Sequence, residues 1–290
     1  MCTPEIKAAD AAATTTLAGA LARARAGFGL DRLDAQLLLL HVLGRTSGER
    51  AWLLAHDTDT LAPEAAARFE GFCLRRRAGE PLAYLTGHKE FFGLDLLVDA
   101  RVLVPRPDTE TLVAWGIDII DGLTAPSVLD LGTGSGAVAL AIQHARPDAC
   151  VEAVDLSADA LAVAQANARR LALPVWCRLA DWFEGTVGRR DLILANPPYI
   201  AEGDAHLPAL RHEPTRALTA GAHGMDDLRR IVADAGAHLA PGGWLLLEHG
   251  HDQAQQVRRL LLDAGFTEVG SRRDLAGIER CSGGQWPAPG

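Results

Sequence analysis

The sequence lacks most features of proteins that bind nucleic acid or cross a membrane. Lysine is almost absent, since Lys7 and Lys89 are the only two in 290 residues, and 28 basic residues stand against 37 acidic ones, for a formal net charge of −9 at pH 7. This balance disfavours a broad basic face, which is the main source of affinity for a phosphate backbone. No apolar run approaches the roughly 18 residues that span a bilayer. We therefore expect no direct binding to nucleic acid and no insertion into a membrane.

Paired cysteines are also missing. The five cysteines are odd in number and widely scattered, and no two of them form a CxxC pair. Disulfide frameworks and zinc sites need paired or closely spaced cysteines, so we expect neither, and no other metal site. The first residues show no basic segment followed by an apolar one, as a secretory signal would. These features together predict a cytoplasmic protein.

The composition changes along the chain in a way that predicts two domains and a linker. Residues 1–83 are rich in alanine, leucine and arginine and predict a small helical bundle. Its helices are expected over residues 14–25, 34–43 and 63–77. Residues 84–104 are rich in aromatic and β-branched side chains interrupted by glycine, which favours a β-hairpin linking the two domains.

The third part, residues 105–290, alternates short apolar strands with helices. Strands are expected over residues 128–131, 151–156, 175–179, 192–195 and 244–247. Alternation of this kind predicts an α/β fold with a doubly wound, Rossmann-like parallel sheet.

A glycine-rich turn follows the first of these strands and precedes a helix. Glycine permits positive φ and lets the backbone approach a ligand closely. The spacing is GxGxG, which is not that of a phosphate-binding P-loop. Asp155 ends the next strand about 20 residues later, where a carboxylate can accept hydrogen bonds from both ribose hydroxyls. The turn consists of Gly132, Thr133, Gly134, Ser135 and Gly136.

A third segment adds an acceptor and two aromatic rings. The strand predicted over 175–179 is followed by Asp181-Trp182-Phe183, which suits the edge and the face of an adenine. Together with the glycine turn and Asp155, this segment indicates a nucleoside ligand at the carboxyl ends of the strands. Phosphate is not required, so an NAD-type dinucleotide is one candidate among others.

The segment Asn196-Pro197-Pro198-Tyr199 follows the fourth strand. Proline has no N–H, so this stretch cannot continue a central strand, and its carbonyls are free to accept hydrogen bonds from a ligand. Asn196 adds a side-chain carbonyl and Tyr199 a flat ring. Two acceptors beside a flat ring suit an NH2 group on a planar carrier.

These segments resemble those of a class I S-adenosylmethionine-dependent methyltransferase that methylates planar nitrogen. More closely, residues 30–280 are similar to the protein-glutamine N5-methyltransferases that modify peptide chain release factors. The similarity also covers the following segments: Glu80 to Gly87, Val104 to Glu110, Glu213-Pro214 and Leu247 to Gly250.

The resemblance implies a substrate, a cofactor and roles for the residues. S-adenosyl-L-methionine would be the cofactor, and the substrate would be the glutamine of the Gly-Gly-Gln motif in release factors, with the helical bundle docking the release factor and the enzyme acting as a monomer. Asn196 to Tyr199 would grip the glutamine amide and carry the catalysis, with Arg106 at the substrate mouth. The Asn196 side-chain carbonyl and the Pro197 carbonyl would accept both amide hydrogens and stabilise the charge that develops on the nitrogen. The cofactor would be bound by Gly132, Thr133, Gly134, Ser135, Gly136, Asp155, Asp181, Trp182 and Asn196.

Two other functions fit parts of the sequence. An adenine N6-methyltransferase acting on nucleic acid would use the same kind of Asn-Pro-Pro-Tyr site, but it needs a basic recognition region. A non-enzymatic scaffold or a translation factor is the second, because Gly283-Gly284-Gln285 repeats the tripeptide found in release factors. Tripeptides recur easily by chance, and we interpret this one as a coincidence.

Overall fold

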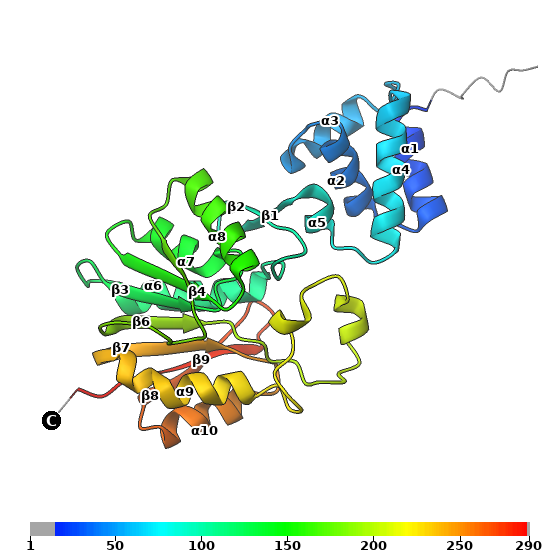
Figure 1. Cartoon of the computed structure of the whole chain (residues 1–290). Helices are drawn as coiled ribbons and strands as arrows, with labels where there is room; N and C mark the ends of the chain where they lie inside the picture. The colour runs from blue at the N-terminus through cyan, green and yellow to red at the C-terminus, as the bar shows by residue number, and fades with distance from the viewer. Residues whose placement is uncertain (1–14, 289–290) are drawn as a thin grey trace, which may run out of the picture. The chain divides into compact units, whose positions relative to one another are not determined.

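The computed structural model describes residues 15–288 and divides the chain into two units, with the division after Thr86 (Figure 1). The predicted boundary of the helical domain lies at residue 83. The start of the helix predicted over 14–25 falls on residue 14, which lies outside the described residues.

The first unit is built of helices. Its elements are α1 (Leu17–Phe28), α2 (Arg32–Val42), the 3₁₀ turn η1 (Ser47–Glu49), α3 (Arg50–Ala55), α4 (Pro63–Arg77) and α5 (Leu82–Thr86). Helix α1 begins where the Thr16 side chain accepts a hydrogen bond from the Gly19 amide, and α4 begins at Pro63, a favoured first helical residue. Buried leucines of α1 and α2 pack with Phe69 of α4 in the core of this unit.

The β-hairpin is shorter than the predicted segment 84–104. It consists of β1 (His88–Phe91) and β2 (Leu94–Leu97), while residues 84–86 form the end of α5. Phe91 and Leu96 are buried in the core of the second unit, so the hairpin belongs to that unit. The strands stop at Leu97 because the chain then turns through Asp99, whose carboxylate accepts a hydrogen bond from the Arg101 amide.

The second unit contains a seven-stranded sheet in the order β5-β4-β3-β6-β7-β9-β8. Strand β9 is antiparallel to both of its neighbours and the other pairs are parallel. The strands are β3 (Ser127–Leu131), β4 (Cys150–Asp155), β5 (Trp176–Leu179), β6 (Arg190–Ala195), β7 (Leu239–Glu248), β8 (Thr267–Arg273) and β9 (Glu279–Gln285). This confirms the predicted α/β fold with its Rossmann-like sheet.

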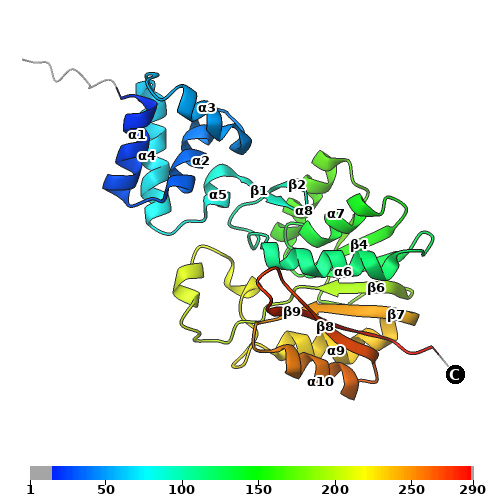
Figure 2. The same cartoon turned by 180° about the vertical axis from the view of Figure 1, so that it is seen from behind.

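Helices cover both faces of this sheet. Figures 1 and 2 show α6, α7 and α8 on one face and α9 and α10 on the other. The remaining elements are η2 (Pro107–Thr109), α6 (Glu110–Ile120), α7 (Ala137–Ala145), α8 (Ala158–Leu171), η3 (Leu207–Leu210), η4 (Thr215–Ala217), α9 (Asp226–His238) and α10 (Ala254–Asp263).

Alternating side chains of the central strands supply the two cores. In β6, Leu192 and Leu194 pack with α6 and α7, whereas Ile193 and Ala195 pack with α9 and α10. Strand β7 follows the same alternation. Because both faces are covered, the inner positions of these strands are apolar, as in Leu192 to Ala195 and Leu245 to Leu247, which is why they could be recognised as short apolar runs.

Within the sheet, Glu152 of β4 forms a buried ion-pair cluster with Arg178 of β5 and Arg190 of β6. The side chain of Glu152 is 6% exposed, and its two oxygens bind Arg178 at 2.9 Å and Arg190 at 2.5 Å. Removing one member of such a cluster leaves the others desolvated and unpaired.

We therefore expect Glu152→Ala to lower the free energy of unfolding by about 3 kcal/mol. Urea denaturation of the full chain measures this change. Asp263→Ala is the control, because it removes a partner of Arg259 on the exposed face of α10. It should leave the urea midpoint unchanged. Equal changes in the free energy of unfolding for the two variants would show that burial of the Glu152 cluster does not increase its contribution to stability.

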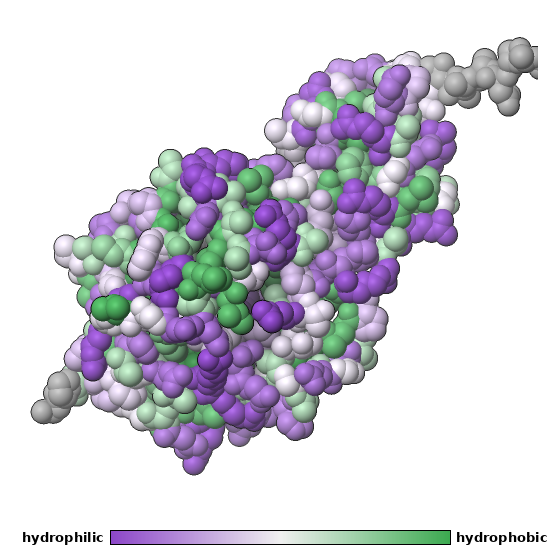
Figure 3. Space-filling model, viewed as in Figure 1, coloured by the Kyte–Doolittle hydropathy of each residue, from purple (hydrophilic) through white to green (hydrophobic). Residues whose placement is uncertain are grey.

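Within residues 15–288, no helix is both long enough and apolar enough to cross a membrane. Figure 3 shows one face of the molecule, on which hydrophobic and hydrophilic residues are interspersed.

Candidate active site

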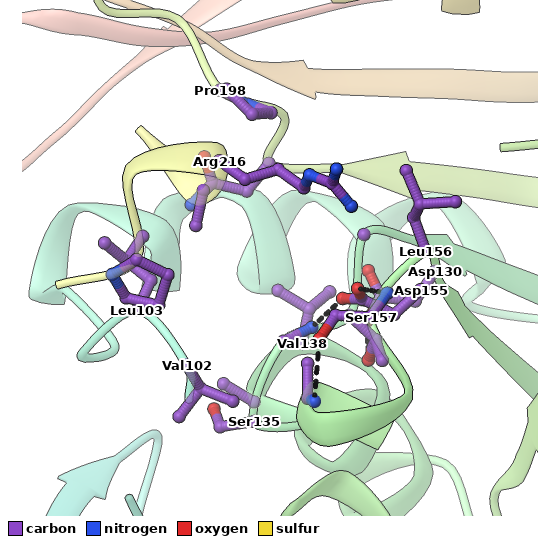
Figure 4. A pocket seen from close by; sticks show the side chains of 18 of the residues that line it. Val102, Leu103, Asp130, Ser135, Val138, Asp155, Leu156, Ser157, Pro198 and Arg216 are labelled. Carbon is purple, nitrogen blue, oxygen red and sulfur yellow. Dashed lines mark hydrogen bonds between the residues drawn. The ribbon is translucent and has the colours of Figure 1, made fainter. Parts of the chain in front are cut away.

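A cavity of about 420 Å³ lies in the second unit, where strands β3, β4 and β6 end (Figure 4). Its lining comes from the loops after these strands, from the segment 101–109 and from the loop around η4. Strand β3 lies between β4 and β6. The chain continues from β3 to β4 and β5 on one side and then returns to β6 on the other side, so the strand order reverses at β3. Parallel sheets bind ligands at such a switch point.

The glycine turn forms the floor of the cavity. Gly132, Gly134 and Gly136 all have positive φ, of 70°, 55° and 86°. The amides of Gly132 and Thr133 both donate to the Val154 carbonyl at 2.9 Å, which ties the turn to the neighbouring strand. A Cβ at Gly136 would lie 3.3 Å from Ala164 Cβ of α8, so glycine also allows the start of α7 to pack closely against α8. At Gly134 a Cβ would meet nothing within 4 Å, because this glycine faces open space.

Asp155 connects the glycine turn to the start of α8. Its Oδ2 accepts from the Gly134 amide and its Oδ1 from the Ser157 amide, both at 2.8 Å. Burial raises the pKa of this carboxyl above its usual value, while the hydrogen bonds from Ser157 and Gly134 oppose the shift. Figure 4 shows Asp155 beside Ser157 and below Leu156, where it lines the cavity.

Asp130, the aspartate of β3, has a different role. Its carboxylate is 2% exposed and accepts from the Thr133 hydroxyl at 2.6 Å and from the Ala139 amide at 3.3 Å. Burial raises its pKa to about 7. These bonds hold both ends of the glycine turn, so Asp130 supports the floor of the cavity.

The Asp181-Trp182-Phe183 segment is only partly brought to the cavity. Asp181 and Trp182 line it, and a Cβ at Gly132 would lie 3.2 Å from Trp182 Cζ3, so the indole ring lies against the glycine turn. Phe183 is buried in the core, where its ring stacks on His238 with centroids 4.5 Å apart. The expectation that both aromatic rings face an adenine is therefore wrong for Phe183, because this side chain packs in the hydrophobic core.

Asn196 and Pro198 line the same cavity on the side of β6. The Asn196 Nδ2 donates to the Thr109 hydroxyl at 3.2 Å, which leaves Oδ1 as the amide atom available to a ligand. Pro197 is buried and Tyr199 is half-buried, and neither contributes to the cavity lining. The Tyr199 hydroxyl instead donates to Glu248 Oε1 at 3.2 Å.

Arg106 lies at the rim, where it is held by an acidic partner distant in sequence. It pairs with Glu213, whose Oε2 also accepts from the Val104 amide at 3.1 Å. Glu213 is buried, and Pro214 after it lines the cavity together with Arg106. Two of the four further segments covered by the resemblance, Val104 to Glu110 and Glu213-Pro214, are thus joined to each other here.

Besides Asp130, four charged residues of the cavity lining were not predicted, namely Arg101, Arg216, Asp227 and Arg230. Arg230 of α9 binds Asp181 through two parallel hydrogen bonds of 2.9 and 2.8 Å, and burial raises the pKa of the neighbouring Asp227. Arg216 of η4 extends into the cavity toward Leu156 in Figure 4 and makes no hydrogen bond or ion pair with residues 15–288. Asp227 and Arg230 lie in α9, and the acidic pair Asp226-Asp227 in its first turn is a pattern typical of a helix start.

The Gly-Gly-Gln tripeptide does not line the cavity. Gly283, Gly284 and Gln285 lie in β9, between β7 and β8, and Gln285 is paired with Trp244, which is level with Leu192 of β6. The Gln285 side-chain amide donates to the Gly242 carbonyl at 2.9 Å. The tripeptide is thus a structural part of the sheet, away from the carboxyl ends of the strands. No cluster of three or more His, Cys, Asp or Glu side chains within residues 15–288 is placed to hold a metal ion.

Comparison with known proteins gives the family. Two family models match, the PrmC N-terminal domain over residues 16–87 and the methyltransferase small domain over residues 117–221. A release factor glutamine methyltransferase from Bordetella pertussis is 53% identical over 260 residues, which cover 88% of this chain and 95% of that relative. The chain belongs to the release factor glutamine methyltransferase family.

Other relatives agree with this membership. A release factor glutamine methyltransferase from Burkholderia pseudomallei is 49% identical over 268 residues, covering 89% of this chain and 93% of that relative. Among solved structures, a 16S rRNA methyltransferase from T. thermophilus, in complex with AdoMet and guanosine, has a TM-score of 0.52 at 20% identity. It covers 68% of this chain and 49% of the T. thermophilus chain, and it supports the fold alone. Family membership confirms the prediction of a methyltransferase.

Proposed function

We propose that this chain transfers a methyl group from S-adenosyl-L-methionine to the side-chain amide nitrogen, N5, of the glutamine in the Gly-Gly-Gln motif of peptide chain release factors. The observation that carries this proposal is the position of the Asn196 amide in the same cavity as the glycine turn and Asp155. Membership of the release factor glutamine methyltransferase family, with relatives of that name at 53% and 49% identity, supports the choice of substrate.

The cavity has the features that this cofactor needs. Its open floor at Gly134 admits a ligand close to the backbone, and Asp155 presents a carboxylate suited to two ribose hydroxyls. We assign the cofactor to Gly132 to Gly136, Asp155 and Trp182, with Asn196 between cofactor and substrate. Asp181 contributes to this region with its charge paired to Arg230. When bound, S-adenosyl-L-methionine supplies a methyl group on positively charged sulfur.

The residues of the chain have to make an unreactive nitrogen accept that group. An amide nitrogen is a poor nucleophile because its lone pair is delocalised into the carbonyl. In this proposal Asn196 Oδ1 and the Pro197 carbonyl accept the two N–H bonds, orient the nitrogen and stabilise the positive charge that it gains. Pro198 borders the glutamine side chain and Arg106 lies at the mouth, while Tyr199, which is outside the cavity lining, supports the segment through its hydrogen bond to Glu248. The proton leaves after the methyl group has been transferred and passes to water.

We expect intact-mass analysis to show one added methyl group on a release factor after incubation with this protein and S-adenosyl-L-methionine. A release factor with Gln→Ala in its Gly-Gly-Gln loop is the matched control and should stay unmodified. Parallel incubations with DNA and RNA test the adenine N6-methyltransferase alternative. Labelled nucleic acid with an unmodified release factor would replace the proposed function by that alternative.

A further inference from the structure

Gln253, the residue that caps the start of α10, is a buried polar side chain beside the active site. It is 8% exposed and does not line the cavity. Its Oε1 accepts from the Gly250 amide at 2.8 Å, and its Nε2 donates to the Tyr199 carbonyl at 3.1 Å. A main-chain N–H can only donate and a carbonyl can only accept, so these two partners fix the orientation of the Gln253 amide.

The bond to Tyr199 anchors a stretch of chain that has few other means of attachment. Pro197 and Pro198 have no N–H to donate. Within residues 15–288, the bond from Gln253 is the only hydrogen bond that the structure gives to the main chain of Pro197 to Tyr199. On the other side of the two prolines, Ala195 is still paired with β7. The positions of the two proline carbonyls therefore depend on Gln253 as well as on strand β6.

The same NH2 group of Gln253 also holds a second loop. Its Nε2 lies 3.4 Å from the His223 carbonyl and 3.3 Å from the Gly224 carbonyl. Gly224 has a φ of 64° and approaches the first segment so closely that a Cβ there would lie 2.1 Å from the Tyr199 carbonyl oxygen. Glycine is therefore required at this point, and Gln253 binds both loops where they meet.

The second loop is part of the cavity wall. Its earlier residues run beside the chain that leaves Tyr199, because the Ile200 amide donates to the Leu218 carbonyl at 2.9 Å and the Ala220 amide donates to the Ile200 carbonyl at 3.1 Å. Four residues just before or within this stretch line the cavity: Pro214, Arg216, Ala217 and Thr219. Gln253 thus fixes the side of the cavity that faces the glycine turn, whereas the glycine turn itself follows β3 and is held by other bonds.

We propose that Gln253 is a positioning residue for the substrate side of the active site, which holds the Asn196–Tyr199 segment and the wall formed by residues 214–219 in place relative to the cofactor. The inference rests on the proposed function. In that function the Pro197 carbonyl accepts one N–H of the substrate amide, and a misplacement of about 1 Å can cost about 10²-fold in rate. Because the prolines cannot anchor themselves by donating, the anchor has to come from a neighbouring side chain.

Two variants of Gln253 test the role of its NH2 group in different ways. Gln253→Glu keeps the length of the side chain and the acceptor for the Gly250 amide, but it has no hydrogen for the three carbonyls when ionised. Gln253→Met has a similar length and no charge, but it also loses the acceptor. A defect that both variants share therefore reports the loss of the donors. Gln256→Met, at an exposed position of the same helix, is the matched control.

The first test separates methylation from cofactor binding. We expect both Gln253 variants to lower kcat for glutamine methylation by about 10- to 100-fold and to raise KM for the release factor. Their affinity for S-adenosyl-L-methionine, measured by calorimetry, should stay that of the wild type, because the glycine turn and Asp155 follow other strands. Wild-type kinetics in both variants would overturn the inference. Loss of cofactor binding in both would also overturn it, because Gln253 would then support the fold as a whole.

The second test needs no substrate, so it separates this inference from the proposed function. Tyr84 and Tyr199 are the only tyrosines in the sequence, and tyrosine labelled with ¹³C at the carbonyl therefore gives two NMR signals. We expect the Tyr199 signal to move upfield in Gln253→Met, because its carbonyl loses a hydrogen bond, while the signal of Tyr84 in α5 stays in place as the internal control. An unmoved Tyr199 signal overturns the inference. Absent glutamine methylation by the wild type, together with the expected shift, would count against the proposed function alone.

Discussion

Asn196→Ala should reduce kcat for glutamine methylation by about 10³-fold, because it removes the acceptor that stabilises charge on the reacting nitrogen. The Asn196 side chain projects from the end of β6, and only its Nδ2 is engaged by the protein. Truncation to alanine therefore deletes the free carbonyl and leaves the β6 backbone in place. Single-turnover kinetics with a release factor measure the effect on the chemical step.

Two controls accompany this variant. Binding of S-adenosyl-L-methionine to Asn196→Ala should remain measurable by calorimetry, because Asp155 and the glycine turn lie on other strands. Its melting temperature should stay close to that of the wild type. A variant that folds, binds the cofactor and keeps near-wild-type turnover would refute the role given to Asn196.

Asp155→Ala should weaken S-adenosyl-L-methionine binding by about 10²-fold, corresponding to the loss of charge-assisted hydrogen bonds to the ribose. Asp155 also holds the Gly134 amide, so the substitution loosens the floor of the cavity at the same time. The wild-type affinity should itself fall at low pH, because the carboxyl pKa is raised by burial and the protonated group loses acceptor capacity. Isothermal titration calorimetry measures both effects.

Asp159→Ala is the matched control for Asp155→Ala. Asp159 lies in the first turn of α8, only four residues away, but its side chain is exposed and does not line the cavity. This variant should bind the cofactor like the wild type. If Asp155→Ala also kept the wild-type affinity, the assignment of Asp155 to the ribose would have to be abandoned.

The sheet could be predicted because its strands are buried on both faces. Residues such as Leu192 to Ala195 form short apolar runs that no helix of ordinary length would produce. Strand β7 was predicted only in part. The sequence indicated residues 244–247, but the strand begins at Leu239 and includes Pro241. Its pairing with β6 shifts register between Arg190 and Leu192, and this irregularity accommodates a residue without an N–H.

The site was predictable where single segments carry it, and less so where the fold assembles it. The glycine turn, Asp155 and Asn196 each follow a strand, and parallel strands bring their ends together. Asp181 and Arg230 are 49 residues apart, and Arg106 and Glu213 are 107 apart, so no local pattern could pair them. No local pattern could assign Thr109 to the site, because its partner Asn196 lies 87 residues away in the sequence.

The Gly-Gly-Gln tripeptide of β9, with both glycines buried and Gln285 half-buried, bears on substrate selection. Strand β9 is hydrogen-bonded on both sides, and the Gln285 amide is engaged by the Gly242 carbonyl. Presenting this glutamine to any active site would require breaking two ladders of the sheet. An enzyme that methylates such a tripeptide in its partner can therefore carry the same three residues and discriminate by conformation rather than by sequence. A methyl group on Gln285 would therefore indicate that this chain had been unfolded while folded, active copies of the same enzyme were present.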